Sequence, residues 1–157
     1  MLIQTHESSQ CRSHVFDEQY PLYGQAYRED IFGPRRTNYS AATGVCLQNN
    51  INFSLHTDAP CSPVGALALV ETAMTRVCTI DNSIIGADQA ISLDDALRAV
   101  TINAARQIGM GDRLSSLEKR KEADITILED NLYKVDAAKI SQIKVSETWV
   151  AGQKRYG

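Results

Sequence analysis

The sequence has no closely spaced cysteine pair, no long hydrophobic run and no large excess of charge of either sign. Its 157 residues include four cysteines, at positions 11, 46, 61 and 78, and carry a net charge of −3. This cysteine spacing excludes a C-x-x-C zinc knuckle or redox motif. The longest apolar run, ALALV at residues 66–70, is far too short to span a bilayer. The charge balance gives no reason to expect a nucleic acid or a membrane surface as a partner.

The N-terminal segment has neither the basic region nor the apolar region of a secretion signal. Together with the scattered cysteines, it predicts a cytoplasmic protein with reduced thiols. The chain is long enough for one ordinary domain, and its 43% hydrophobic and 22% charged residues are typical of globular proteins. Residues 1–11 carry no hydrophobic pattern, so we expect a disordered or truncated start there.

The stretch INFSLHTDAP, residues 51–60, has the alternation of a β-strand that ends on ionisable side chains. Residues two apart share one face of a strand, so Phe53 and Leu55 lie on an apolar face. By the same spacing, His56 and Asp58 lie on a polar face. A polar row of this kind is either the solvent face of a half-buried sheet or part of a functional site.

The residues before this strand predict a second strand and a long loop. Residues 12–16 have the pattern of a short strand. Two prolines and two glycines interrupt residues 17–36, which predicts a long loop of the kind that is usually functional or disordered. A weak helical pattern over residues 38–49 then leads into the strand at residue 51.

The residues after the strand predict two helices and then antiparallel strands. Ser62 and Pro63 suit the N-cap and first position of one helix, and Ser92 opens a second that ends at Gly109. The pattern then becomes that of strands, over residues 123–128 and 144–150, with a final hairpin. Two βα units cannot close a barrel, whose common form needs eight. The chain therefore has the pattern expected for the tail of a larger α/β architecture.

Four stretches resemble segments of the metal-dependent amidohydrolases, specifically the YtcJ-like branch, amidohydrolase family 3. They are HTDAP at residues 56–60, ISLDDALRAVTINAARQIGM at 91–110, RLSSLEKRKEADITILEDNLY at 113–133 and VSETWVAGQKRY at 145–156. The resemblance implies a (β/α)8 barrel of TIM type joined to a small β-sandwich. In that arrangement, residues 12–112 supply the last two βα units of the barrel, and residues 113–157 supply the C-terminal sandwich strands.

The resemblance gives Asp58 the main chemical role. It matches the aspartate at the C-terminal end of the final barrel strand, which in these hydrolases binds the catalytic metal or activates the metal-bound water. An ionised carboxylate suits both roles, because it is a hard oxygen ligand and a proton acceptor. The alternative is an aspartate that caps the following turn. His56 is either a partner that orients Asp58 or a satisfied interior histidine.

The resemblance also implies two substrate-binding residues. His14 resembles the histidine near the seventh strand of the family and is expected to contact substrate rather than metal. Arg36, beside Arg35, matches a family stretch in which a guanidinium group can hold a substrate carboxylate, although an exposed surface pair is the alternative. Asn103 matches a helix position with a structural hydrogen-bonding role.

The other metal ligands of the family have no counterpart in this sequence. The family supplies them from an H-x-H pair and from histidines on middle strands, whereas this chain has three histidines and no H-x-H. We therefore predict a fragment of a hydrolase that cleaves a non-peptide C–N bond of a small amide-type substrate. The divalent metal, zinc, is expected in the full-length enzyme, and this chain alone is expected to be inactive. Its expected protein partners are a second copy or an upstream barrel half.

A second reading is a non-catalytic α/β module that binds a partner or completes a separately encoded barrel half. An exposed seam of apolar residues would favour it. A serine or cysteine hydrolase has little support, because no nucleophile elbow is present. The sequence also departs from the family at Lys119-Arg120, where a Pro-Gly pair is usual, which puts the geometry of that turn in doubt.

Overall fold

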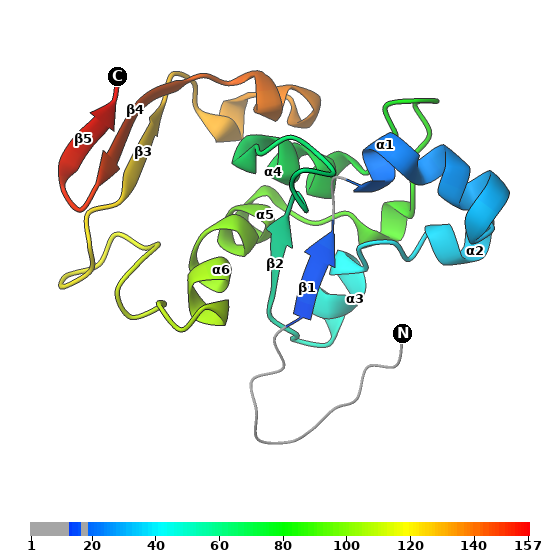
Figure 1. Cartoon of the computed structure of the whole chain (residues 1–157), viewed down its shortest axis with the longest axis horizontal. Helices are drawn as coiled ribbons and strands as arrows, with labels where there is room; N and C mark the ends of the chain where they lie inside the picture. Colours follow the sequence, from blue (N-terminus) through cyan, green and yellow to red (C-terminus); the bar gives the residue numbers. More distant parts are fainter. Residues whose placement is uncertain (1–12, 17–18) are drawn as a thin grey trace.

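The computed structural model describes residues 13–16 and 19–157. The predicted start over residues 1–11 lies outside this described part. Figure 1 shows an α/β part around two short strands, β1 (Ser13–Phe16) and β2 (Phe53–His56), and an antiparallel sheet at the C-terminal end of the chain. Within the described ranges, no helix is both long and apolar enough to cross a membrane.

β1 and β2 form the parallel pair that two successive βα units require. Their register runs from Ser13 opposite Phe53 to Phe16 opposite His56. Both strands are predicted from the sequence, and the structure confirms them. Because parallel strands end at the same edge of a sheet, the segments that follow the two strands leave from one edge.

The segment between β1 and β2 is helical, so the long loop predicted over residues 17–36 is wrong. It contains α1 (Gln19–Ala26), the π-helical turn η1 (Tyr27–Ile31), α2 (Pro34–Thr37) and α3 (Thr43–Gln48). Pro21 lies in the first turn of α1 and Pro34 is the first residue of α2, where a missing N–H costs no helical hydrogen bond. The prolines therefore start helices here rather than interrupt them.

Three helices follow β2, with a short turn between the first two. They are α4 (Ala66–Thr75), α5 (Leu93–Val100) and α6 (Ile102–Gln107), and the turn is η2 (Ala87–Gln89). The predicted cap at Ser62 is wrong, because α4 begins later and the Ser62 hydroxyl donates to the carbonyl of Thr57. The cap at Ser92 is confirmed, since its Oγ accepts the N–H of Asp95 at 3.2 Å. The second predicted helix is divided at Thr101, whose ψ of −100° interrupts the helical backbone.

The C-terminal sheet has the antiparallel order β3-β4-β5. Its strands are β3 (Ile125–Leu128), β4 (Val145–Val150) and β5 (Gln153–Tyr156), and the turns η3 (Leu132–Lys134) and η4 (Ala137–Gln142) connect the first two. Ala151 and Gly152 both have positive φ, as the tight turn between paired strands requires. The predicted strands and hairpin are confirmed.

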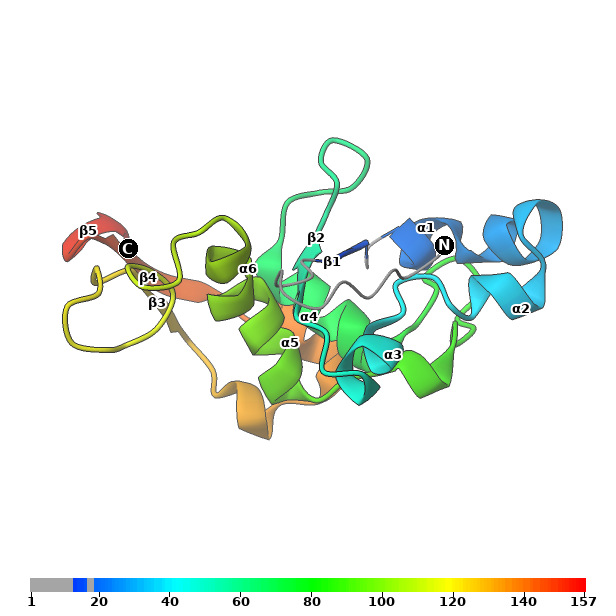
Figure 2. The same cartoon turned by 90° about the horizontal axis from the view of Figure 1, so that it is seen from below.

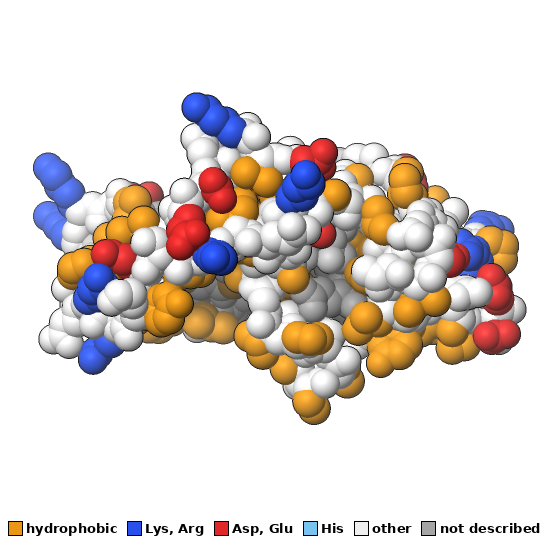
Figure 3. All heavy atoms as spheres, turned by 90° about the horizontal axis from the view of Figure 1, so that it is seen from above, with side chains coloured by type: hydrophobic (Ala, Val, Ile, Leu, Met, Phe, Trp, Pro, Cys, Tyr) orange, Lys and Arg blue, Asp and Glu red, His pale blue; other side chains and the backbone are white. Residues whose placement is uncertain are grey.

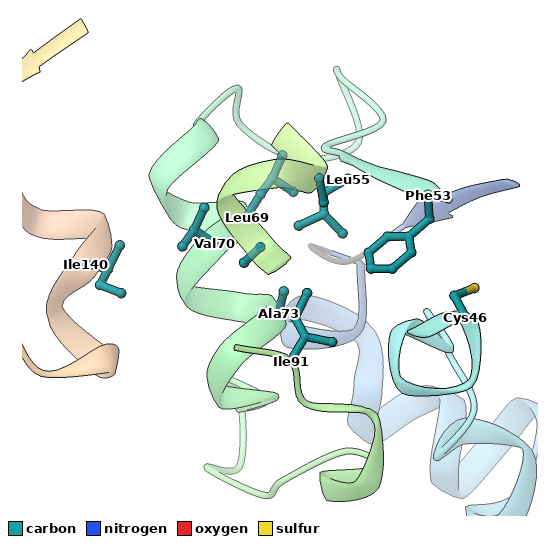
Figure 4. Packing of buried hydrophobic residues seen from close by; sticks show 10 residues of the cluster. Cys46, Phe53, Leu55, Leu69, Val70, Ala73, Ile91 and Ile140 are labelled. Atoms are coloured by element: carbon teal, nitrogen blue, oxygen red, sulfur yellow. The ribbon is translucent and has the colours of Figure 1, made fainter. Parts of the chain in front are cut away.

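The core lies where β2 meets α4 and α5 (Figure 4). Phe53 and Leu55 point into it, which confirms the predicted apolar face of the strand. Ser54, on the opposite face, is also buried, and its hydroxyl donates to Gln107 Oε1 of α6 at 2.5 Å. β2 is therefore covered on both faces near its start, as is usual for parallel strands, and its polar row is not a plain solvent face.

A fully buried arginine ties the helical connection to the end of α4. Arg76 has a φ of 58°, and its guanidinium donates to the carbonyls of Ser40, Ala41 and Ile85 at 2.6–2.9 Å. It also stacks 4.2 Å from the ring centroid of Tyr20 in α1. These contacts fix α1, and therefore the segment after β1, against the segment after β2.

Candidate functional site

Asp58 lies just beyond the carboxyl end of β2. The strand ends at His56, and the chain then turns through Asp58, which has a φ of 52°. Aspartate is one of the few residues that enter this left-handed region at modest cost. The loop that it opens projects from the body of the molecule (Figure 2). The strict alternation that would place His56 and Asp58 on one strand face therefore stops before Asp58.

The backbone of Asp58 is held on both sides. Its N–H donates to Nδ1 of His56 at 3.3 Å, and its carbonyl accepts the N–H of Cys61 at 2.8 Å. The short contact from Ser62 to Thr57 closes the same turn. His56 thus contacts the backbone of Asp58 rather than its carboxylate, and its role as an orienting partner stays a prediction.

The carboxylate of Asp58 is held by Gln19, a residue outside every motif in the sequence. Gln19, the first residue of α1, donates from Nε2 to Oδ2 of Asp58 at 2.8 Å. The Tyr27 hydroxyl in turn donates to Oε1 of Gln19 at 3.4 Å. Burial raises the pKa of Tyr27, with smaller contributions from Tyr23 and from Cys61. Segments after both strands therefore meet at this carboxylate.

No local pattern in the sequence pointed to Gln19. It lies 39 residues before Asp58, in the stretch predicted to be a loop. The signal that exists is positional: Gln19 follows β1 as Asp58 follows β2, and catalytic groups of α/β barrels gather at the carboxyl ends of their strands.

The structure tests neither of the predicted substrate-binding residues directly. The backbone of His14 pairs with Ser54 in β2, and its side chain lies outside the described part. Arg35 and Arg36 are exposed on α2 and line a hollow of about 900 Å³ with aromatic residues such as Phe32 and Tyr39. The described residues that line this hollow do not include Asp58. The roles of His14 and Arg36 stay predictions.

The described residues do not form a metal site by themselves. No group of three or more histidine, cysteine, aspartate or glutamate side chains is placed among them to hold a metal ion. A catalytic zinc site takes about three protein ligands and one open position. Asp58 supplies one carboxylate, and its bonded neighbours are an amide and an imidazole whose Nδ1 faces the backbone. The donor set of this part of the chain does not fit a metal ion.

The chain is thus an α/β segment in which the Asp58 carboxylate lies at the carboxyl end of a parallel strand. A profile of the amidohydrolase family matches residues 7–156. The chain belongs to the amidohydrolase family, which confirms the resemblance seen in its motifs. The family is metal-dependent, and the mixed α/β fold is consistent with a segment of its TIM-type barrel.

Two curated relatives show how much of such a protein the chain spans. It is 30% identical over 110 residues to the N-substituted formamide deformylase of Arthrobacter pascens, covering 70% of this chain and 20% of that protein. It is 30% identical over 132 residues to the 5-methylthioadenosine/S-adenosylhomocysteine deaminase of Teredinibacter turnerae, covering 75% and 29%. The chain thus spans less than a third of the length of either relative.

Two solved structures support the fold. A metal-dependent hydrolase from Pyrococcus horikoshii matches with a TM-score of 0.65 and 19% identity, covering 82% of this chain and 26% of that one. A zinc-bound adenosine deaminase from Xanthomonas campestris matches with a TM-score of 0.54 and 22% identity, covering 79% and 31%. At these identities the likeness establishes the fold alone.

Proposed function

We propose that the chain forms the last two βα units and adjoining C-terminal strands of an amidohydrolase that cleaves a non-peptide C–N bond. Family membership supports the reaction class, and the names of the two relatives, a deformylase and a deaminase, both describe the cleavage of such bonds. The substrate is a small amide-type molecule. The observation that carries the proposal is the Asp58 carboxylate at the carboxyl end of β2.

The chemistry assigned to Asp58 is proton transfer. Gln19 holds Oδ2, and among the described residues no hydrogen bond reaches Oδ1. That oxygen is available to take a proton from an attacking water and to return it to the leaving nitrogen, as a general base and then a general acid do. The divalent metal of the family, zinc, belongs to the complete catalytic unit, and its other ligands come from outside the described residues.

The first prediction is that the purified chain is inactive alone. One carboxylate with no further ligands among the described residues gives little affinity for zinc. We expect no hydrolysis of an N-substituted formamide and no stoichiometric zinc by mass spectrometry. Hydrolysis by the chain that disappears in Asp58→Asn would overturn this prediction. Asp130→Asn, at an exposed position after β3, is the matched control.

The second prediction concerns Asp58 in a complete barrel. A chimera in which this chain replaces the aligned region of the Arthrobacter deformylase supplies the remaining strands. We expect the chimera to hydrolyse an N-substituted formamide, and Asp58→Asn to lower kcat by about 10²–10⁴-fold, the range typical of a lost general acid or base. A chimera that stays fully active with Asp58→Asn would contradict the assignment.

The second reading, a non-catalytic module that completes another barrel half, is favoured by exposed apolar surface. Large hydrophobic side chains are exposed over much of the chain, and Val64 and Leu117 are 84% and 82% exposed. Figure 3 shows hydrophobic side chains reaching the surface across one face. A largely apolar groove of about 850 Å³ also lies between α4, α5 and the C-terminal sheet, lined by residues such as Leu97 and Trp149. An active Asp58→Asn chimera would support this reading.

A further inference from the structure

We propose that Gln19 is a positioning residue that fixes the orientation of the Asp58 carboxylate, and that Tyr27 fixes Gln19. The inference rests on the proposed function of Asp58. It adds to the Asp58 turn two residues from the segment after β1 that no sequence motif identifies. Both residues act through Asp58 rather than on the substrate.

The polarity of the hydrogen bonds sets the direction of the Gln19 amide. A carboxylate only accepts hydrogen bonds, so the side of the amide that faces Asp58 must be the NH2 group. The Tyr27 hydroxyl donates to the opposite side, the carbonyl oxygen Oε1. With Oε1 occupied by a donor, the NH2 group is directed to Oδ2 of Asp58, 2.8 Å away.

The backbone contacts of Asp58 do not set the orientation of its side chain. His56 and Cys61 hold the Asp58 N–H and carbonyl, but neither contact restrains rotation about the side-chain bonds. Among the described residues, Gln19 provides the hydrogen bond to the carboxylate. It binds one oxygen and leaves the other available to a substrate, as preorganisation of a reacting group requires.

A second glutamine in the same helix provides a matched control. Gln25 in α1 also directs its Nε2 toward a carboxylate, that of Glu29, at 3.4–3.5 Å. That hydrogen bond is exposed, and it joins two residues of the same segment, four positions apart. Gln25→Met removes the same chemical group from the same element without touching Asp58.

The test on the whole chain measures the order of the Asp58 side chain by NMR, through its Hα–Hβ couplings. Gln19→Met keeps the length and volume of the side chain and removes both hydrogen bonds. We expect couplings of a single Asp58 rotamer in the native chain and in Gln25→Met, and averaged couplings in Gln19→Met. Tyr27→Phe is expected to average them in part and to shift the Gln19 side-chain amide signals. A single Asp58 rotamer in both Gln19→Met and Tyr27→Phe would overturn the proposal.

The same substitutions in the deformylase chimera separate this proposal from the function of Asp58. We expect Gln19→Met to lower kcat by about 10–100-fold with KM unchanged, because a misplaced group loses rate rather than binding. Gln19→His, which keeps a donor, is expected to recover part of the loss. Full activity in Gln19→Met together with an inactive Asp58→Asn refutes the positioning role alone. Full activity in Asp58→Asn refutes the proposed function.

Discussion

At the scale of single residues, the folded chain gives several side chains properties that their local sequence does not show. Asp58 is identified by its place in the HTDAP motif, but its left-handed backbone and its bond to Gln19 are properties of the folded chain. Lys121 is a smaller example. Its Nζ donates to the Gly111 carbonyl at 2.6 Å and to the Ser116 hydroxyl at 2.5 Å, contacts that depend on the fold of the turn.

A residue-scale prediction concerns Arg120, which stands where the family usually has glycine. Its φ is 77°, a left-handed conformation that costs a residue with a side chain roughly 1–2 kcal/mol. Glycine removes that cost and adds about 0.5–1 kcal/mol of unfolded-state entropy. We therefore expect Arg120→Gly to raise the free energy of unfolding by about 0.5–1 kcal/mol in urea titrations.

The neighbouring position is the control for this substitution. Lys119 is also exposed, and its φ is not positive, so Lys119→Gly is expected to lower the free energy of unfolding. Equal effects of the two substitutions would contradict the strain assigned to Arg120.

At the scale of elements, local sequence signals predicted those that carry their own start and stop residues. The strands, the final hairpin and the Ser92 cap all follow from short patterns. The helices between β1 and β2 could not be predicted in this way. Proline is common both in loops and in the first turn of a helix, so Pro21 and Pro34 do not distinguish the two. Packing of Tyr20 against the buried guanidinium of Arg76 helps to decide between the two.

An element-scale prediction concerns the Ser92 cap of α5. The Ser92 Oγ accepts the Asp95 N–H and donates to the Asp95 carboxylate at 2.6 Å. Ser92→Ala removes both bonds and is expected to lower the free energy of unfolding by about 1 kcal/mol, the usual value of an N-cap. Thermal or urea unfolding measures the loss. Ser141→Ala, an exposed serine that contributes its backbone N–H to a hydrogen bond, should change little.

At the scale of the whole molecule, exposed large apolar side chains outnumber buried ones among the described residues. The exposed ones lie on both the α/β part and the C-terminal sheet, as Ile108 and Ile127 illustrate. Large exposed apolar patches occur at protein–protein interfaces and at ligand-binding grooves, among other sites. This agrees with a chain that spans less than a third of its curated relatives.

A whole-molecule prediction concerns the stability of the fold at acid pH. Hydrogen bonds from Ser83, and then from Arg28, hold the pKa of Asp81 well below its usual range. Lys154 and then Trp149 lower the pKa of Glu147. A carboxyl group whose pKa is depressed by folding stabilises the protein above its unfolded pKa, and this stability is lost as pH falls toward its folded pKa.

We therefore expect the unfolding temperature to fall as pH drops below about 4.5, near the ordinary carboxyl range. Thermal unfolding followed by circular dichroism over a pH series tests this. Ser83→Ala removes the first cause of the Asp81 shift and should make the decline shallower. An unfolding temperature that does not change between pH 5 and pH 2 would contradict the prediction.

The sequence by itself determined the strands, the capped helix, the family and the position of Asp58, because each depends on short patterns or on motifs read in order. Tertiary structure alone decided which side chain meets the Asp58 carboxylate. Gln19 lies 39 residues away, and it reaches Asp58 because β1 and β2 pair in parallel and end at one edge. A contact over that separation depends on strand pairing and on the buried Arg76 contacts, which no local pattern encodes.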